Sequence, residues 1–278
     1  MSSPLRFVRL RNRASTFRIG RVAGRAAMMR GGNRPKGKNS MKKSFGKTAS
    51  SLVALLIAGH FAIVKGGPIE TSVVHRPIVV ACVGDSITAG SGAEKGRSYP
   101  AQLGAMLGEK WTVNNFGVSG ATLLNHGDKP YQQQAAFKKA LESAPDVVVI
   151  MLGTNDTKPQ NWKFKNEFVA DYKNLIGQFA ALPSKPKMFV CHPAFVPGQG
   201  NYGINEAGVK EQIPLIDKLA TDEKAAVIDV HGSLADHAEL LPDRVHPNTK
   251  GATLMARAIF KSLTGKEFSG EPVFEKPR

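Results

Sequence analysis

A serine, an aspartate and a histidine in this sequence have the types and local spacing needed for nucleophilic chemistry. The stretch ACVGDSITAGSG at residues 81–92 ends an apolar run with Gly-Asp-Ser, which places the Ser86 hydroxyl just past a buried segment. A serine is a weak nucleophile near neutral pH unless a base takes its proton and an acceptor holds that base in the right tautomer. Asp243 and His246, in the loop DRVHPN, supply a carboxylate and an imidazole three positions apart. We therefore interpret Ser86 as the nucleophile, His246 as the base and Asp243 as the group that orients His246.

The elements that must position these side chains alternate between strands and helices from Pro77 onward. Apolar runs typical of buried strands lie at residues 78–83, 112–116, 147–152, 187–191 and 226–230. Segments of helical period lie at residues 99–107, 133–143, 165–181, 205–220 and 249–263. This alternation predicts a parallel sheet with helices on both faces. We expect a three-layer α/β/α sandwich of the flavodoxin type, with a five-stranded parallel sheet, over residues 77–265.

The segments that follow the strands carry most of the residues able to do chemistry. Ligands of open α/β sheets bind beyond the carboxyl ends of the strands. At those positions the sequence has, in order, GDSIT, GVSGAT, GTND and HPAF, and DRVHPN precedes the last predicted helix. We expect these segments to meet at one edge of the sheet.

Four of these blocks together resemble the SGNH, or GDSL, hydrolase family. They are GDSIT with Ser86, NNFGVSGAT with Gly117, GTND with Asn155, and DRVHP with Asp243 and His246. One block alone is a weak signal, whereas the ordered set at successive strand ends is specific. The resemblance covers about residues 78–264, and it implies the fold predicted above and ester hydrolysis by a Ser-His-Asp mechanism.

The resemblance also implies a set of donors for the anion that forms when Ser86 attacks an ester carbonyl. These are the backbone N–H of Ser86, the backbone N–H of Gly117 and the side-chain amide of Asn155, which together form an oxyanion hole. A glycine suits this role because it lacks a Cβ and its backbone can approach a substrate closely. We interpret Asp85 and Asp156 as supporting residues that accept backbone N–H groups.

Each of these residues has a purely structural alternative. Ser86 could be the N-cap of a helix, Asn155 could form an Asx-turn, and DRVHP could be a surface turn. Ser119, in GVSGA, is a second candidate nucleophile, but its segment lacks the final glycine of the G-x-S-x-G elbow.

Other patterns suggest no cofactor and no metal. GQGNYG at residues 198–203 matches a dinucleotide-binding fingerprint, but it does not directly follow a strand, and we interpret it as a flexible loop. The histidines His192, His231 and His237 show no metal-ligand spacing such as H-E-x-x-H.

The formal charge of +16 lies almost wholly at the N-terminus. Residues 1–50 contain 14 of the 38 Lys and Arg residues and none of the Asp and Glu residues. The remaining chain is nearly neutral, so nucleic acid is not the expected partner. We interpret residues 1–50 as a basic leader that need not belong to the mature protein, with either Met1 or Met41 as the start.

An apolar segment follows this leader. SLVALLIAGHFAIV at residues 51–64 is shorter than the roughly 20 residues of a spanning helix, and MKKSFGKTAS before it has the character of a signal-peptide n-region. We interpret residues 51–76 as a signal-peptide-like segment with a linker, and residues 266–278 as a C-terminal extension. These features predict a secreted or periplasmic protein, with membrane contact only through an uncleaved N-terminal segment.

The leading hypothesis is an exported serine esterase that removes small acyl groups, above all acetyl, from carbohydrate. Phe195, Tyr202 and Trp162 could pack against sugar rings, or could be packing residues only. Because His246 must be neutral to act as the base, activity is predicted to rise between about pH 6 and 8. The alternatives are a lysophospholipase, thioesterase or arylesterase of the same family, and a non-catalytic carbohydrate-binding envelope protein. The oligomeric state stays open.

Overall fold

The structure is a computed structural model that describes residues 68–69 and 76–274. The chain divides into two units, Met1–Gly59 and His60–Arg278, and every described residue belongs to the second. The predicted basic leader and apolar segment therefore lie outside the described residues. No helix in the described ranges has the length and apolar character needed to cross a bilayer.

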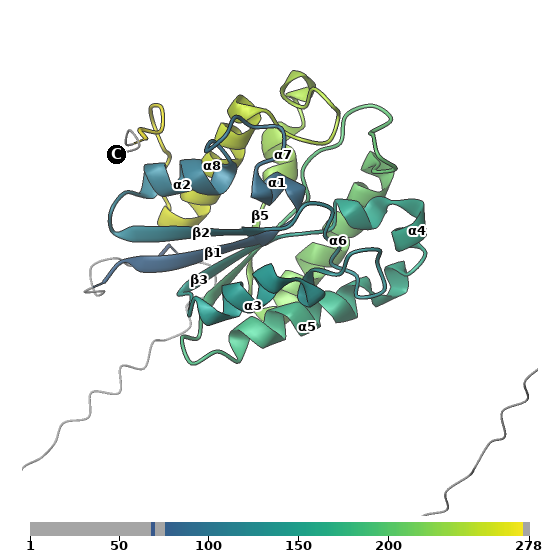
Figure 1. Cartoon of the computed structure of the whole chain (residues 1–278), viewed down its shortest axis with the longest axis horizontal. Coiled ribbons are helices and arrows are strands. Elements are labelled where there is room, and N and C mark those ends of the chain that lie inside the picture. The colour runs from purple at the N-terminus through teal and green to yellow at the C-terminus, as the bar shows by residue number, and fades with distance from the viewer. Residues whose placement is uncertain (1–67, 70–75, 275–278) are drawn as a thin grey trace, which may run out of the picture. The chain divides into compact units, whose positions relative to one another are not determined.

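The core of the second unit is a five-stranded parallel sheet with the order β2-β1-β3-β4-β5 (Figure 1). The strands are β1 (Ile78–Gly84), β2 (Trp111–Gly117), β3 (Val147–Met151), β4 (Lys187–Cys191) and β5 (Ala226–Ile228). Every residue of β3 is buried and so is nearly all of β1, because helices cover both faces of these central strands. The predicted fold class is confirmed.

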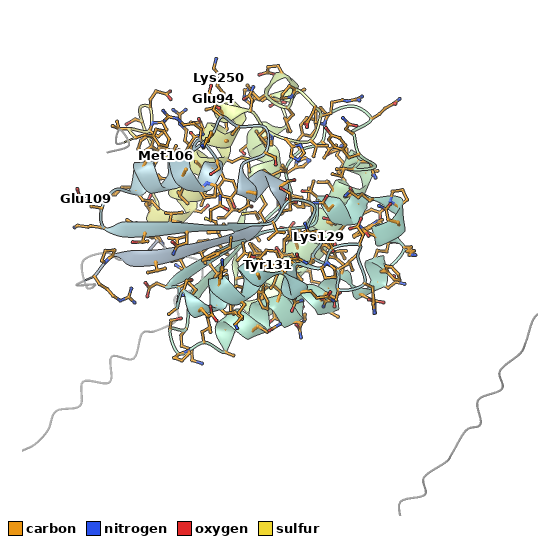
Figure 2. The ribbon with its side chains drawn as sticks, viewed as in Figure 1. Glu94, Met106, Glu109, Lys129, Tyr131 and Lys250 are labelled. Atoms are coloured by element: carbon orange, nitrogen blue, oxygen red, sulfur yellow. The ribbon has the colours of Figure 1, made fainter. Side chains whose placement is uncertain are left out.

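Helices form a layer on each face of the sheet (Figure 1). One layer contains α2 (Tyr99–Leu107), α7 (Val230–Leu234) and α8 (Thr249–Thr264), and the other contains α3 (Ala135–Glu142), α5 (Phe168–Ala180) and α6 (Glu206–Glu223). Successive β1 residues point to opposite faces: Cys82 packs in the first layer and Ala81 in the second. Figure 2 labels one core side chain of each layer, Met106 and Tyr131.

Several short helices lie between the longer elements, and apart from η3 and the end of η1, which fall in the helices predicted at residues 165–181 and 133–143, they were not predicted. They are α1 (Ser86–Ala89), α4 (Pro159–Trp162) and four single 3₁₀ turns, η1 (Tyr131–Gln133), η2 (Asn155–Thr157), η3 (Lys165–Glu167) and η4 (Ala238–Leu240). The fifth strand is also shorter than predicted. Asp229 caps α7 by accepting the N–H of Gly232 at 2.8 Å, so the chain turns helical at Val230, which we had placed in the strand.

The last described residues pack back on the domain. Phe268 contacts Phe260 of α8 with ring centroids 5.3 Å apart, and the Arg257 guanidinium donates to the Gly270 carbonyl at 2.6 Å. The guanidinium of Arg97 lies 3.6 Å from the Phe274 ring centroid. The C-terminal extension therefore contacts α8 and the loop that precedes α2.

Candidate active site

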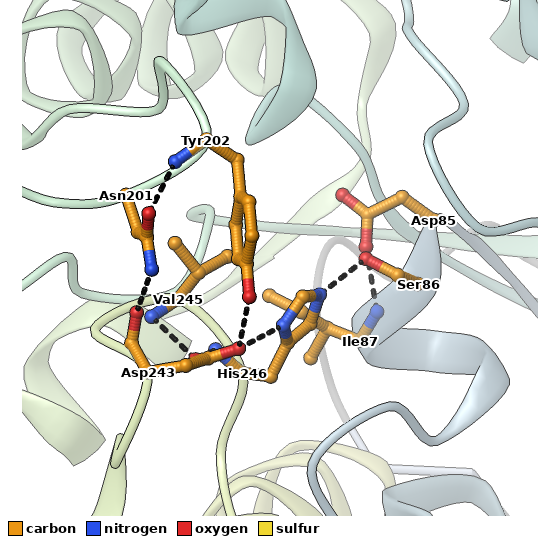
Figure 3. Close-up of polar contacts among 8 residues, drawn as sticks. All are labelled: Asp85, Ser86, Ile87, Asn201, Tyr202, Asp243, Val245 and His246. Atoms are coloured by element: carbon orange, nitrogen blue, oxygen red, sulfur yellow. Dashed lines mark hydrogen bonds and ion pairs between the residues drawn. The ribbon is translucent and has the colours of Figure 1, made fainter.

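The turn between β1 and α1 places Ser86 at the carboxyl edge of the sheet. Asp85 caps α1 by accepting the Ile87 N–H at 2.9 Å, so the aspartate and not the serine fills the N-cap position. Ser86 is the first residue of α1, and 8% of its surface is exposed. Its hydroxyl is free of a capping role and points towards the loop that precedes α8 (Figure 3).

That hydroxyl, an imidazole and a carboxylate form a hydrogen-bonded series of three side chains (Figure 3). Ser86 Oγ lies 2.9 Å from His246 Nε2, although 160 positions separate the two residues in the chain. His246 Nδ1 lies 2.7 Å from Asp243 Oδ2. With the proton on Nδ1, the unprotonated Nε2 accepts the serine hydroxyl, which is the arrangement that a general base requires.

The Asp243 carboxylate is held by its own loop. Its Oδ1 accepts the backbone N–H groups of His246 at 2.7 Å and Val245 at 3.0 Å. Partial burial opposes ionisation, but hydrogen bonds from the backbone and side chain of His246 outweigh it and lower the pKa of Asp243 below its usual value. The carboxylate is therefore ionised near neutral pH, as an acceptor for Nδ1–H must be. Asn248, two residues beyond His246, caps α8 by accepting the Gly251 N–H at 3.0 Å.

A loop between β4 and α6 packs against this pair of residues, a contact that the sequence analysis did not anticipate. Asn201 Nδ2 donates to the Asp243 carbonyl at 3.2 Å, and the Tyr202 hydroxyl lies 3.5 Å from Asp243 Oδ2. The Tyr202 ring centroid is 6.0 Å from that of His246 (Figure 3). This loop is the GQGNYG segment, which the sequence analysis interpreted as a flexible loop and not as a dinucleotide site; the structure places it beside the loop of Asp243 and His246.

Asn155 and Asp156 occupy the turn η2 directly after β3. Asn155 is 3% exposed; its Nδ2 donates to the Ala121 carbonyl at 3.1 Å and makes a long contact of 3.5 Å with Asp85 Oδ2. Asp156 accepts the backbone N–H groups of Leu123 at 2.9 Å and Leu124 at 2.8 Å. Both Asp85 and Asp156 thus accept backbone N–H groups, the contacts expected of supporting residues.

Burial changes the ionisation of these two supporting carboxyls. Desolvation raises the pKa of Asp85 to about 6, against the opposing effect of the Ile87 N–H. Desolvation raises the pKa of Asp156 to about 7, although two backbone N–H groups favour its ionised form. Neither carboxyl contacts the Ser86 hydroxyl in the described structure, and both hold loops.

The placement of Gly117 in the site needs a correction. β2 continues through Gly117, which pairs with Gly84 of β1, and its N–H donates to Asn115 Oδ1 at 2.9 Å. A Cβ on Gly117 would lie 2.2 Å from the backbone nitrogen of Ala89, so the close packing of β2 on α1 accounts for this glycine. The sequence analysis ended this strand at Phe116, one residue early, and took Gly117 as an oxyanion-hole donor from the family resemblance.

Gly120 lies where Gly117 had been expected. Its φ of +80° favours glycine, and it lines the cleft next to Ser86. Among the described residues no acceptor takes a hydrogen bond from its N–H. The signal in the sequence was the second glycine of GVSGAT, which follows a turn and not the strand itself.

An open cleft of about 320 Å³ surrounds the Ser86 hydroxyl. The lining residues are Ser86, Ser91, Ser119, Gly120, Asn155, Lys158, Tyr202, Ile204 and His246. Ser119 is part of this cleft, but the hydroxyl in contact with His246 Nε2 belongs to Ser86. The structure therefore brings together Ser86, His246, Asp243 and Asn155.

Other residues considered in the sequence lie away from the cleft. Trp162 donates to Glu211 at 2.9 Å and packs against Phe168, and Phe195 packs against His231. His192 lies between the carboxylates of Asp217 and Asp229, and His231 and His237 pair with Glu206 and Glu239. Within the described ranges no group of histidine, cysteine and acidic side chains has the arrangement of a metal site.

Comparison with known proteins identifies the family to which this fold and site belong. Residues 82–254, more than half of the chain, match the GDSL-like Lipase/Acylhydrolase family. The chain belongs to this family.

The chain is also similar to an acetylxylan esterase of Xylanibacter ruminicola. The two are 40% identical, and the match covers 67% of this chain and 43% of that protein. The chain thus matches less than half the length of this curated relative.

Solved structures share the fold. A carbohydrate acetylesterase from Sinorhizobium meliloti has a TM-score of 0.54 at 22% identity, covering 67% of this chain and 98% of the other. A catalytic mutant of an acetylxylan esterase from Geobacillus stearothermophilus has a TM-score of 0.55 at 20% identity, covering 71% and 99%. At these identities the likeness concerns the fold.

Proposed function

We propose that this protein is a serine esterase that removes acetyl groups from carbohydrate. The observation that carries the proposal is the hydrogen-bonded series of Ser86, His246 and Asp243 at the mouth of a cleft. A module that only binds carbohydrate has no use for a base aligned on a serine hydroxyl. The family and the acetylxylan esterase relative support the same reaction class.

In the proposed reaction Ser86 Oγ attacks the ester carbonyl while Nε2 of His246 takes the hydroxyl proton. The imidazolium that forms is stabilised by the ionised Asp243 at Nδ1. His246 then protonates the departing sugar oxygen, leaving an acetyl group on Ser86. A water molecule, deprotonated by the same Nε2, releases acetate and restores the serine.

Three donors are proposed to stabilise the oxyanion formed in each step. The first is the N–H of Ser86, which lies in the first turn of α1 where no intrahelical acceptor is available. The second is the N–H of Gly120. The third is Nδ2 of Asn155, which has two N–H groups and gives only one of them to a close acceptor, the Ala121 carbonyl. Losing one such donor typically lowers the rate by about 10²–10³.

A pair of serine variants tests the assignment. Ser86→Ala removes the nucleophile and is expected to abolish acetate release from acetylated xylo-oligosaccharide. Ser119→Ala removes a hydroxyl from the same cleft that does not contact His246, and it is expected to keep most of the activity. Equal rates in Ser86→Ala and the wild type would disprove the proposal. Faster hydrolysis of long-chain acyl esters than of acetyl esters would instead favour a lipase or thioesterase.

We further propose that the protein is exported. The support is the sequence alone: the basic MKKSFGKTAS segment followed by the apolar run at residues 51–64. The test is to express the full chain and a shorter chain that starts at Gly66, and to fractionate the cells. Activity outside the cytoplasm for the first chain only is expected; equal cytoplasmic retention of both would contradict export.

A further inference from the structure

One cationic side chain lines the cleft beside the nucleophile. Of the nine lining residues, Lys158 alone carries a permanent charge, and none is a carboxylate. Lys158 follows η2, the turn that holds Asn155, and is half-buried. Within the described residues its ammonium forms no ion pair. Its charge helps to lower the pKa of the buried Asp85, and it also acts on a ligand that enters the cleft.

The loop that carries Tyr202 supports the lysine side chain. A Cβ built on Gly203 would lie 3.7 Å from Lys158 Cγ, so the aliphatic part of the lysine lies close to this loop. Tyr202 itself is 59% exposed, although its ring flanks the His246 ring. An exposed aromatic ring and a cation thus border the same entrance, and an acidic sugar presents an apolar ring face together with a carboxylate.

A second ammonium lies next to two of the lining residues. Lys129, in the loop between β2 and η1 (Figure 2), donates from Nζ to the Ser119 carbonyl at 2.9 Å. Ser119 and the adjacent Gly120 both line the cleft. The carboxylate nearest in sequence, Asp128, is engaged by the side-chain amides of Asn161 and Gln160. The entrance therefore has two cations from separate loops.

We propose that this entrance recognises a carboxylate on the saccharide that carries the ester, so that the preferred substrate is an acetylated acidic saccharide. Lys158 binds the carboxylate, Tyr202 stacks on a sugar ring, and Lys129 adds positive potential at the Ser119 side. The inference rests on the proposed esterase function and specifies its substrate class. It makes Lys158 a determinant of specificity.

The test compares two matched substrates. One is an acetylated oligosaccharide with a uronic acid beside the acetylated sugar, and the other is its carboxyl-reduced counterpart, which has the same size without the charge. The quantity measured is the ratio of kcat/KM for the acidic substrate to that for the neutral one. We expect this ratio to exceed 1 in the wild type and to fall as salt is raised from 10 to 500 mM, because salt screens exposed charges.

Variants assign the effect to Lys158. Lys158→Gln is expected to lower the ratio about three- to fivefold, the range for a partly exposed ion pair, and Lys158→Arg is expected to preserve it. The matched control is Lys163→Gln: Lys158 directly precedes α4 and Lys163 directly follows it, but Lys163 stacks on Phe164 outside the cleft lining. Its ratio should equal that of the wild type.

The possible results separate this inference from the function on which it rests. A ratio of 1 in the wild type, an unchanged ratio in Lys158→Gln, or an equal fall in Lys163→Gln would each overturn the acidic-saccharide proposal while leaving the esterase intact. Failure of the wild type to release acetate from either substrate, or from any short acyl ester, would overturn the esterase itself.

Discussion

At the scale of single residues, Asp243 is fixed more firmly than any other group of the site. Its Oδ1 accepts the backbone N–H groups of Val245 and His246, and its Oδ2 lies 2.7 Å from Nδ1 of His246. A carboxylate held in this way imposes one tautomer and one ring orientation on the histidine. In the proposed mechanism Asp243 acts through His246, because it does not reach the Ser86 hydroxyl itself.

Replacing this carboxylate by an amide tests that role. Asp243→Asn is nearly isosteric but offers Nδ1 only one possible acceptor oxygen, which the two backbone N–H groups also require. We expect kcat on a short-chain ester to fall by about 10³–10⁴, as for similar changes in serine hydrolases. Circular dichroism provides the folding control. A fall of less than tenfold in a folded variant would contradict the proposed orienting role.

The raised pKa of Asp156 predicts that the stability of the protein depends on pH. Its folded pKa of about 7 lies above the unfolded value of about 3.9. Below pH 4 the Asp156 carboxyl is protonated in both the folded and the unfolded protein. Between pH 4 and 7 it is ionised in the unfolded protein and still protonated in the folded protein. The free energy of unfolding therefore decreases as pH rises through this window. The free energy of unfolding should fall by on the order of 1 kcal/mol per pH unit in this window through this group.

Urea unfolding of the wild type and Asp156→Asn at pH 4.5, 5.5 and 6.5 isolates this effect, because Asp85 titrates in both proteins. The stability of the wild type relative to the variant should decrease as pH increases. Parallel curves would show that the burial of Asp156 does not produce the expected linkage.

At the scale of elements, the contact between β2 and α1 holds Ser86, the proposed nucleophile, in place. Gly117→Ala would put a methyl group 2.2 Å from the Ala89 nitrogen, in backbone that no side-chain rotation can relieve. We expect a loss of about 1–3 kcal/mol in the free energy of unfolding, together with reduced kcat because α1 must move.

A second glycine provides the control for this prediction. Gly177 lies on the exposed side of α5, and a Cβ there meets nothing within 4 Å. Gly177→Ala should raise stability by about 0.5–1 kcal/mol, the difference in helix propensity, with no change in kcat. Thermal melts of Gly117→Ala and Gly177→Ala measure both changes in stability. Equal changes in the two variants would contradict the packing argument.

The sequence was most informative where burial dictates residue type. Long apolar runs such as β3 and β4, and the helix from Tyr99 to Leu107, lie where they were predicted because a sheet covered on both faces requires continuous hydrophobic strands. Elements of four or five residues were missed, since α1 and α4 are too short to show a helical period. The Gly117 assignment has another origin: it was taken from the resemblance, whose block NNFGVSGAT holds two glycines, and only the structure shows that Gly120 is the one that lines the cleft.

Contacts between loops could not be predicted for a different reason. That Asn201 holds the Asp243 carbonyl depends on the path of the loop between β4 and α6, and neither hydrophobic period nor spacing describes that path. The same holds for Lys158, whose position in the cleft is set by the turn after β3. The residues proposed to select a substrate therefore emerged only from the three-dimensional arrangement.

At the scale of the whole molecule, every contact described at the site joins residues between Asp85 and Gly251. A chain that begins at Gly66 is therefore expected to hydrolyse a short-chain ester with the kcat/KM of the full chain. Kinetic assays of the two purified proteins check this. A more than threefold loss in the shorter chain would show that the N-terminal residues contribute to the folded domain or its cleft.

The 160 positions between Ser86 and His246 also mean that, in the proposed mechanism, the serine gains its base only after early and late parts of the domain sequence have assembled. An incompletely folded chain contains the same serine without its base. A fluorophosphonate reagent should consequently label native molecules rapidly and urea-unfolded molecules hardly at all. The labelled fraction would then serve as a direct count of correctly assembled chains during refolding.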